Sequence, residues 1–249
     1  MIATAPVPRE NPVPFAAVPS PLLTPHIRAQ LSPQQADFLD EVLTHYRAGW
    51  FPMNDPDTGR TEWVQARRRG IIPLQPDTFH VPGTLKARIK SGRFRIETDT
   101  AFSAVIRACA TPAAGRKDTW IDPLIIETFD LLHRIGLAHC VEAWLDEPGT
   151  PDTQPTPRLV GGLYGLALGK IFCGESMFSL PDEGGTDASK VCLVNLVEHL
   201  QMRGFCALDA QLSNPHLAQF GMYEIGRHAY QRWLDQWADT PLEWLPWKR

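Results

Sequence analysis

The sequence has little that would support a disulfide framework or a metal centre. Its 249 residues include five cysteines, an odd number, and no two of them form a Cys-x-x-Cys pair. Such a set predicts neither a disulfide framework nor a cysteine zinc site. The eight histidines show no His-Glu-x-x-His motif, and no two of them lie three to five residues apart. We therefore expect no metal ion.

Long apolar segments are also missing. No run approaches the roughly 18–20 apolar residues that a membrane-spanning helix needs. The Pro- and Ala-rich start lacks the basic and apolar regions of a secretory signal. Hydrophobic residues make up 43% and charged residues 21% of the chain, as is typical of a soluble globular protein. We expect a cytoplasmic protein with no membrane partner.

Charge is distributed unevenly along the chain. The formal net charge is −4, which by itself argues against a nucleic-acid partner. The segment from Arg60 to Lys117, however, holds twelve Lys and Arg against four acidic residues, so it carries +8 and the rest of the chain −12. This asymmetry fits a surface that binds nucleic-acid phosphates. It fits equally well a solvated face of ion pairs.

Hydrophobic periodicity and turn residues predict helices, then antiparallel strands, then a helix, a strand and a helix. The expected helices cover 33–47, 84–91, 100–110, 122–135, 188–203 and 226–238, with Ser32 and Asp187 as N-caps. The expected strands cover 94–98, 139–145, 159–168, 171–178 and 205–212. Residues 1–25 are expected to form a flexible arm, 50–59 a loop and turn, and 147–158 a hairpin loop. A hairpin followed by a long helix and a strand predicts an α+β fold with an acyltransferase-like core.

Polar side chains in the expected strands are candidates for a site. Because side chains alternate along a strand, Asp209 and Gln211 point to the same face. If buried, both need partners; they form a site or, alternatively, cap a loop and bond to the backbone. Glu175, in an otherwise apolar strand, is either a buried paired acid or a group that binds a cation or hydroxyl. Trp120 follows a basic turn and either stacks on a base or belongs to the core.

Other kinds of site have less support. Cys173, Cys206 and His139 could join Asp209 in a thiol triad, but buried strand cysteines usually act as small hydrophobes. Ser176 does not stand in a Gly-x-Ser-x-Gly nucleophile elbow. The glycines form neither a dinucleotide fingerprint nor a P-loop. The segment before the long helix also lacks the phosphate loop of coenzyme A acetyltransferases, so acetyl-CoA is disfavoured.

A set of longer motifs runs through the chain in a fixed order. They are Tyr46-Arg-Ala-Gly-Trp-Phe-Pro52, Thr119-Trp-Ile121, Gly136-Leu-Ala-His-Cys-Val-Glu-Ala-Trp144, Leu159-Val-Gly-Gly-Leu-Tyr-Gly165, Phe172-Cys-Gly-Glu-Ser-Met-Phe-Ser179, Asp187-Ala-Ser-Lys190 and Leu208-Asp-Ala-Gln211. In this order they resemble the leucyl/phenylalanyl-tRNA–protein transferases of bacteria, over about residues 31–237.

The resemblance implies an enzyme that moves Leu or Phe from aminoacyl-tRNA to the N-terminal Lys or Arg of a protein, which marks that protein for N-degron degradation. It implies a GCN5-related acetyltransferase-like core over residues 67–249 and a small N-terminal domain over residues 26–66. An apolar pocket discriminates one methylene by only about 1–3 kcal/mol, so weak transfer of Met is expected. Aminolysis of an ester is downhill, so no cofactor is expected.

The resemblance also implies roles for individual residues. The family's reacting pair falls on Asp209 and Gln211, and its contacts to the 3′-aminoacyl-adenosine fall on Trp120 and Glu175. Its apolar side-chain pocket falls on Leu163, Phe172 and Met177, and Ser176 is grouped with these substrate-binding residues. The expected contacts to tRNA are Arg67, Arg68, Lys86, Arg88 and Lys90.

The two residues of the reacting pair have different chemical capacities. A carboxamide cannot hold a proton at neutral pH, so Gln211 is expected to orient the amine or the ester. Asp209 is expected to fix Gln211 and is a candidate to accept the proton of the amine, directly or through water.

The chain departs from the family pattern at a few positions. Met53 and Glu62 stand where the family usually has Trp, and Leu163 stands where Met is common. A lost stacking partner would weaken binding of the adenosine by roughly 1–3 kcal/mol. Two other hypotheses therefore stay open: a GCN5-like acyltransferase with another donor, and a non-catalytic tRNA-binding relative.

Overall fold

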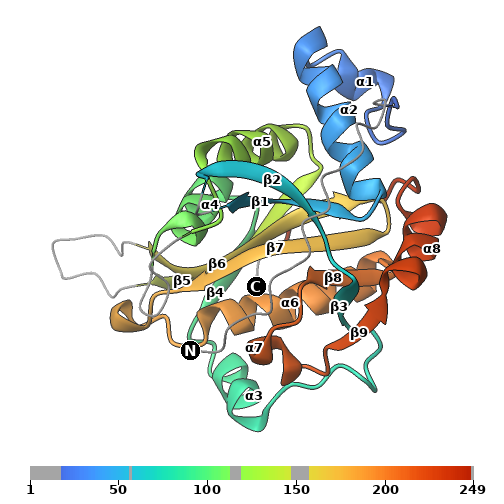
Figure 1. Ribbon diagram of the computed structural model, residues 1–249. Coiled ribbons are helices and arrows are strands. Elements are labelled where there is room, and N and C mark those ends of the chain that lie inside the picture. Colours follow the sequence, from blue (N-terminus) through green and yellow to red (C-terminus); the bar gives the residue numbers. More distant parts are fainter. Residues whose placement is uncertain (1–17, 56–57, 113–118, 147–156, 248–249) are drawn as a thin grey trace, which may run out of the picture.

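The structure is a computed structural model that describes residues 18–55, 58–112, 119–146 and 157–247. It is a mixed α+β fold in which helices cover both faces of one large sheet (Figure 1). In chain order the elements are α1 (Pro25–Arg28), α2 (Pro33–Arg47), β1 (Trp50–Asp55), β2 (Arg60–Gln65), β3 (Arg68–Ile72), α3 (Gly83–Lys90), β4 (Arg95–Thr98), α4 (Phe102–Ala110), α5 (Pro123–Arg134), β5 (Ala138–Asp146), β6 (Pro157–Leu168), β7 (Ile171–Ser179), the 3₁₀ turn η1 (Pro181–Glu183), α6 (Ala188–Arg203), β8 (Ala207–Gln211), α7 (Pro215–Ala218), β9 (Tyr223–Gly226) and α8 (Arg227–Trp237). No helix among these described residues is long and apolar enough to cross a membrane.

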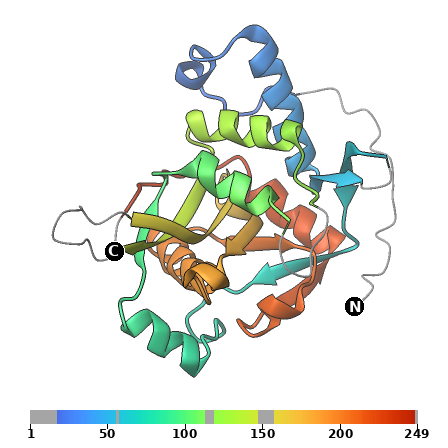
Figure 2. The same cartoon turned by 90° about the vertical axis from the view of Figure 1, so that its left-hand side faces the viewer.

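The central sheet has seven strands in the order β4-β5-β6-β7-β8-β3-β9, and β1 pairs with β2 in a separate antiparallel ribbon. Neighbours in the large sheet are antiparallel except β7 and β8, which pair in parallel. Parallel neighbours need a crossover connection, and helix α6 supplies it. Helix α6 packs on one face of the sheet, and α4 and α5 lie on the other (Figure 2).

Alternating side chains divide the core into two layers. Tyr164 and Cys173 belong to the cluster under α2, α4 and α5, whereas their neighbours Leu163 and Phe172 belong to the cluster under α6. The close packing of α6 depends on Gly161 in β6. A Cβ there would stand 2.4 Å from the Cβ of Ala188, which is inside van der Waals contact.

The expected helices and strands between residues 33 and 238 are confirmed to within a few residues. Helix α2 begins at a reciprocal capping box in which Ser32 and Gln35 each accept from the other's backbone N–H. The expected role of Asp187 is wrong in one respect. It occupies the N-cap position of α6, but its carboxylate accepts from Lys190 Nζ at 2.9 Å and caps no helix N–H.

Four strands were not expected from the sequence. Residues 50–59, expected as a loop and turn, begin with β1, which pairs with β2 from Trp50 opposite Gln65 to Asp55 opposite Arg60. Strands β3 and β9 extend the large sheet beyond β8. All four are short, and the residues of β2 are mostly half-buried, so their hydrophobic alternation is weak. Strands β3 and β9 also depend on partners far away in the sequence, whereas β1 and β2 pair with each other.

The expected flexible arm differs from what the structure describes. Its first 17 residues lie outside the described part of the chain, as do residues 147–156 of the expected hairpin loop. The end of the arm is packed rather than free, because Leu22 and Leu23 are buried. The backbone N–H of Ser20 donates to Asp40 Oδ1 at 2.7 Å and anchors this segment on α2.

A buried carboxylate in β5 supports the start of α4. Glu142 is fully buried, and its Oε1 accepts from the backbone N–H groups of Thr100 and Ala101, both at 2.7 Å. Its Oε2 accepts from the Thr100 hydroxyl and from Trp144 Nε1. Ala101, at the N-cap position of α4, has no side chain that could cap the helix. Glu142 instead anchors the two residues that lead into α4 to a neighbouring strand.

We expect Glu142→Ala to lower the free energy of unfolding by about 2–4 kcal/mol, because it removes the acceptor of the Thr100 and Ala101 N–H groups and opens a cavity. Urea unfolding followed by circular dichroism measures this loss. The matched control is Glu127→Ala on the exposed face of α5, which should change the free energy by less than about 0.5 kcal/mol. Equal effects of the two substitutions would contradict this anchoring role.

Candidate active site

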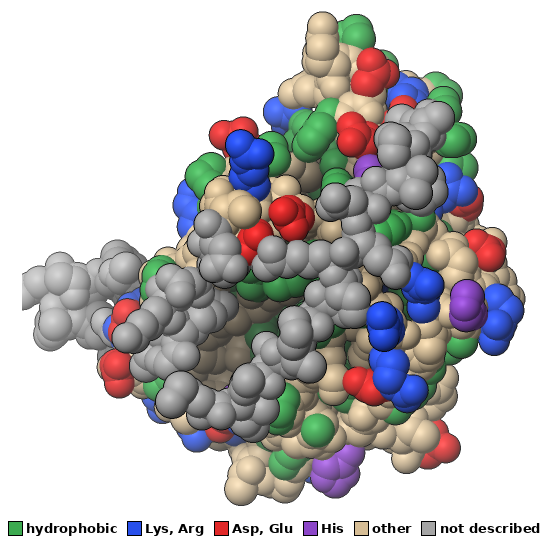
Figure 3. Space-filling model, viewed as in Figure 1, with side chains coloured by type: hydrophobic (Ala, Val, Ile, Leu, Met, Phe, Trp, Pro, Cys, Tyr) green, Lys and Arg blue, Asp and Glu red, His purple; other side chains and the backbone are tan. Residues whose placement is uncertain are grey.

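A cavity of about 380 Å³ opens where β7 and β8 separate. The two strands pair from Ile171 opposite Ala207 to Cys173 opposite Asp209 and then diverge. Figure 3 shows a hollow on this face of the molecule, with hydrophobic side chains inside it. The residues that follow the last pair on each strand line the cavity, among them Glu175 and Gln211. The end of the pairing therefore creates the space, and the same two strands supply its polar groups.

Glu175 reaches the cavity because of a β-bulge. Tyr164 pairs with Ser176 and Gly165 pairs with Gly174, so Glu175 is the extra residue of β7. A bulge interrupts the regular alternation and re-aims the side chain. Glu175, Ser176 and the following Met177 consequently all line the cavity.

A buried ion pair forms the base of the site. Arg69 Nε lies 2.9 Å from Asp209 Oδ1, and Arg69 Nη2 lies 2.7 Å from Oδ2. Arg69 is 2% exposed and Asp209 is 0% exposed. The guanidinium lies between the rings of Phe51 and Tyr230, with its Cζ 4.7 Å and 4.6 Å from their centroids. Burial is the largest single influence and lowers the pKa of Arg69, but the charge and hydrogen bonds of Asp209, together with Tyr230 and Cys173, raise the pKa further than burial lowers it, so Arg69 stays positively charged.

Two more donors complete the shell of Asp209. The Tyr230 hydroxyl donates to Oδ2 at 2.8 Å, and the backbone N–H of Gln211 donates to Oδ1 at 2.8 Å. The second bond helps to hold Gln211 in the left-handed region, at φ 60°. A non-glycine residue at such an angle is strained. Asp209 thus fixes both the position and the backbone conformation of Gln211.

Gln211 and Tyr46 connect the ion pair to Glu175. The Gln211 side-chain amide donates from Nε2 to Glu175 Oε2 at 2.9 Å, and the Tyr46 hydroxyl donates to Oε1 at 2.9 Å. Burial raises the pKa of Glu175 to about 7, although these two hydrogen bonds and Arg69 lower it. At neutral pH Glu175 therefore exists as a mixture of acid and carboxylate.

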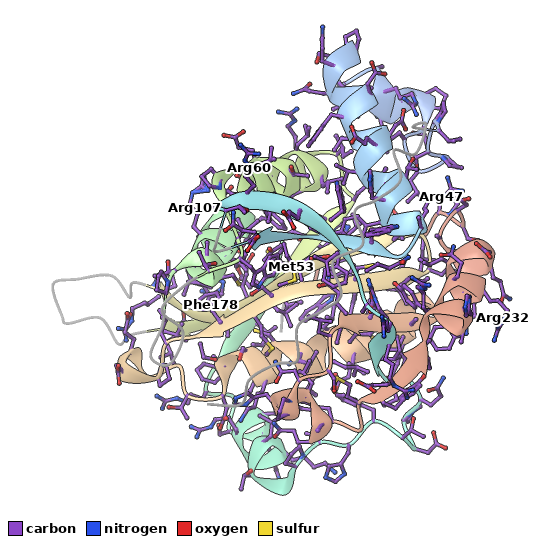
Figure 4. The ribbon with its side chains drawn as sticks, viewed as in Figure 1. Arg47, Met53, Arg60, Arg107, Phe178 and Arg232 are labelled. Carbon is purple, nitrogen blue, oxygen red and sulfur yellow. The ribbon has the colours of Figure 1, made fainter. Side chains whose placement is uncertain are left out.

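The cavity has two chemically different halves. The apolar half belongs to the α6 layer and is lined by Leu163, Met177, Leu193, Leu196 and Leu208. The aromatic half belongs to the opposite layer and is lined by Phe51, Met53, Trp120 and Tyr164. Figure 4 shows Met53 near the middle of the molecule, between the β1–β2 ribbon and β7. We call the polar residues Glu175, Asp209 and Gln211 the throat, because they lie where the two halves meet.

Most residues expected from the sequence meet at this cavity. Its lining includes Asp209, Gln211, Glu175, Ser176, Trp120, Leu163 and Met177. Phe172 is the exception, because it is fully buried and stacks on Trp244, with ring centroids 5.5 Å apart. Strand alternation turns it away from Cys173 and into the layer below α6.

The structure adds residues that the sequence did not single out. Arg69, Tyr46 and Tyr230 hold the throat, whereas the sequence groups Arg69 only with the basic segment from Arg60 to Lys117. The neighbouring Arg68 is exposed. Alternation along β3 could have distinguished the buried arginine from the exposed one, but this strand was not expected from the sequence. The thiol triad does not form, because His139 Nδ1 bonds to Asp99 at 2.8 Å and the ring stacks on Trp244.

The residues expected to contact tRNA come from two elements. Lys86, Arg88 and Lys90 lie on α3, which packs against α6. Arg67 precedes β3 and Arg68 lies in it, and both are exposed. Two of the five take part in ion pairs, Arg68 with Glu224 at 2.7 Å and Arg88 with Asp187 at 3.7 Å.

Adjacent arginines of β3 provide a test of the ion pair. Arg69→Met should destabilise the protein by about 3–5 kcal/mol, because it leaves the charge of Asp209 buried without a partner. Arg68→Met removes the same charge from an exposed side chain, so its effect should stay within about 1 kcal/mol. Chemical unfolding of both variants gives the comparison. A loss for Arg69→Met no larger than that for Arg68→Met would show that the buried pair is unimportant for stability.

Comparisons with known proteins agree with the geometry. Residues 73–235 match the family described as leucyl/phenylalanyl-tRNA protein transferase. A leucyl/phenylalanyl-tRNA–protein transferase of Paramagnetospirillum magneticum is 49% identical over 203 residues, covering 81% of this chain and 90% of the relative. One of Chlorobaculum parvum is 45% identical over 197 residues, covering 79% and 93%. The crystal structure of FemX shares the fold, with a TM-score of 0.50 and 12% identity over 76% of this chain and 66% of FemX. The chain belongs to the leucyl/phenylalanyl-tRNA–protein transferase family.

Proposed function

We propose that this protein transfers leucine or phenylalanine, and more weakly methionine, from aminoacyl-tRNA to the N-terminal Lys or Arg of proteins. The product carries an N-degron and is marked for degradation. One observation carries the assignment to this cavity: a throat of Glu175, Asp209 and Gln211 lies between an apolar and an aromatic half. This is the arrangement that an apolar aminoacyl ester and an attacking amine require.

The finer description of the fold is part of the proposal. Residues 67–249 form a GCN5-related acetyltransferase-like catalytic domain, and residues 26–66 a small N-terminal domain. Antiparallel strands β4 to β7, the parallel pair β7 and β8, and the crossover helix α6 support it. The N-terminal part also contributes to the site, since Tyr46, Phe51 and Met53 reach the cavity or its network.

The two halves of the cavity separate the parts of the donor. The apolar half accepts the side chain of the transferred amino acid, because the described residues that line it, such as Leu163, Met177 and Leu196, include no charged group. A charged side chain would lose its hydration there without compensation. The aromatic half accepts the terminal adenosine, which stacks on Trp120. Ser176 lies between them and binds the ester end.

The reaction is the attack of a neutral amine on the ester carbonyl. The α-amino group has a pKa of about 7.7–8.0, so a useful fraction is neutral near pH 7. Most of the catalysis comes from holding amine and ester together in the throat. Gln211 orients the reacting groups, and Asp209 fixes Gln211 through the bond to its backbone N–H. No energy source is required, because an ester is exchanged for an amide.

The first test mixes the purified protein with Phe-tRNA or Leu-tRNA and a peptide that begins with Arg, and follows labelled amino acid into the peptide. We expect transfer that requires a free N-terminus, so an N-acetylated peptide should be inert. Gln211→Ala should lower kcat/KM by about 10²-fold or more, since it removes the group that orients the reactants.

The control for that substitution is Gln219→Ala, whose side chain bonds outside the cavity to the carbonyl of His216. It should retain wild-type activity. Binding of tRNA without any transfer of Leu, Phe or Met would overturn the proposal in favour of a non-catalytic tRNA-binding relative. Acyl transfer that does not depend on tRNA would instead favour a different donor.

Exposed basic residues of α3 hold the acceptor stem through its phosphates. The double variant Lys86→Ala/Lys90→Ala should raise the KM for aminoacyl-tRNA and leave the KM for the peptide unchanged. Each lost phosphate contact should also reduce the slope of log affinity against log salt by about 0.7–0.9. The control is Arg134→Ala/Lys170→Ala, which removes two positive charges from α5 and the β6–β7 turn. Equal salt slopes for the two double variants would argue against α3 as the tRNA surface.

A further inference from the structure

The throat contains two carboxylates, Asp209 and Glu175, and they differ in how many hydrogen-bond donors their oxygens already accept from. An ionised carboxylate offers about four lone-pair sites for hydrogen bonds. Asp209 receives donors from β3, from α8 and from its own strand, namely Arg69, Tyr230 and the backbone N–H of Gln211. Together their contacts fill its capacity. The same group is fully buried, so an incoming proton would have to displace one of these donors.

Glu175 retains room for a further donor. Among the described residues, Tyr46 donates to Oε1 and the Gln211 side chain donates to Oε2. Each oxygen keeps a second lone pair, and 8% of the residue remains exposed, whereas Asp209 has no exposed surface. The bulge directs this carboxylate into the cavity rather than into the sheet. An amine in the throat can therefore reach Glu175 without breaking an existing bond.

We propose that Glu175 is the group that accepts the proton of the attacking amine, and that Asp209 is a positioning residue that holds Gln211. This inference rests on the proposed function, because it concerns the same transfer. It moves the role of proton acceptor, for which the sequence made Asp209 a candidate, to Glu175, which was expected to contact the 3′-aminoacyl-adenosine. Asp209 keeps its expected role of fixing Gln211.

The proposed step moves one proton from the amine through Glu175 to the leaving oxygen, and none is gained or lost. The neutral amine attacks the carbonyl carbon, and a C–N bond forms while the carbonyl oxygen becomes an oxyanion. The nitrogen, now positively charged, gives a proton to the carboxylate of Glu175. The C–O bond to the 3′-oxygen of the tRNA then breaks, and protonated Glu175 passes the proton to that oxygen. The products are an amide and a free 3′-hydroxyl, and Glu175 returns to its starting state.

The surroundings of Glu175 suit a group that must both take up and release a proton. Tyr46 from α2 and Gln211 from β8 donate to it, Arg69 from β3 and Asp209 from β8 act through their charges, and Tyr164 from β6 and Cys173 from β7 lie near it. Burial is the largest influence and raises its pKa to about 7. A base with a pKa near the working pH is the most effective in proton transfer.

The sign of the pH dependence follows from this arrangement. Only the carboxylate accepts a proton, so the transfer rate should rise with pH through about 7. The α-amine adds a second rise near its own pKa of about 7.7–8.0, and this rise belongs to the peptide rather than the enzyme. In Glu175→Gln the first rise should disappear while the second remains. In Tyr46→Phe the first rise should move to higher pH, because the lost hydrogen bond had lowered the pKa of Glu175.

The experiment is single-turnover transfer from Phe-tRNA to an Arg-initiated peptide at saturating concentrations, measured from pH 5.5 to 9. Glu175→Gln should slow the step by about 10²–10⁴-fold at pH 8. A titration of the peptide at the same pH should show little change in the concentration that gives half the maximal rate. Urea unfolding of each variant checks that it is folded. If the profile of Glu175→Gln keeps the bend near pH 7, the inference is overturned.

Rescue by small carboxylates separates proton transfer from a structural role. Glu175→Ala opens a space in the throat that formate or acetate can enter. The rescued rate should increase with the basicity of the added carboxylate, which replacement of a hydrogen-bond acceptor alone would not produce. Asp209→Ala, treated in the same way, should show no such dependence.

The outcomes distinguish this inference from the proposed function. Rescue of Asp209→Ala that follows basicity would return the proton acceptor to Asp209 and overturn the inference alone. A wild-type protein that transfers no amino acid from Phe-tRNA would overturn the proposed function, and this inference with it. A lost bend in Glu175→Gln, a shifted bend in Tyr46→Phe and basicity-dependent rescue of Glu175→Ala together support the assignment.

Discussion

The ion pair between Arg69 and Asp209 is the contact on which the rest of the site depends. It joins β3 to β8, Tyr230 of α8 adds a third element, and Arg69 Nη1 donates to the carbonyl of Gly49 just after α2 at 3.1 Å. Buried pairs of this kind add little net stability, because both charges must leave water. The pair instead fixes the position of the end of β8, and with it the backbone conformation of Gln211, the last residue of that strand. A hydrophobic pair could pack there equally well but could not hold the Gln211 N–H.

The cavity forms where β7 and β8 separate, next to the fixed end of β8. Parallel pairing ends at Cys173 opposite Asp209, and the bulge at Glu175 lies immediately beyond. The same interruption of regular structure therefore opens the space and directs an acid into it. It also lets the cavity pass from one face of the sheet to the other, so that apolar and aromatic linings meet at the throat. A continuous sheet would keep these two layers apart.

The sequence was sufficient for elements that carry their own signals. Helix α2 has a capping box and an apolar stripe, and strands β5 to β7 form long apolar runs. It was insufficient where a partner far away decides, as for β3, whose five residues begin with two arginines. Without that strand, alternation could not separate buried Arg69 from exposed Arg68. Phe172 was misplaced for the related reason that a run buried on both faces does not reveal which side chains face a cavity.

The two throat carboxylates differ in their roles because their hydrogen-bond partners differ, not because one is an Asp and the other a Glu. Asp209 faces a guanidinium, a hydroxyl and a backbone N–H, and its charge is neutralised in place. Glu175 faces two neutral donors, and burial raises its pKa to about 7. Gln211 touches both, through its backbone on one side and its amide on the other. The carboxamide therefore links the two carboxylates, and in the proposed transfer Asp209 holds Gln211 in place while Glu175 takes the proton.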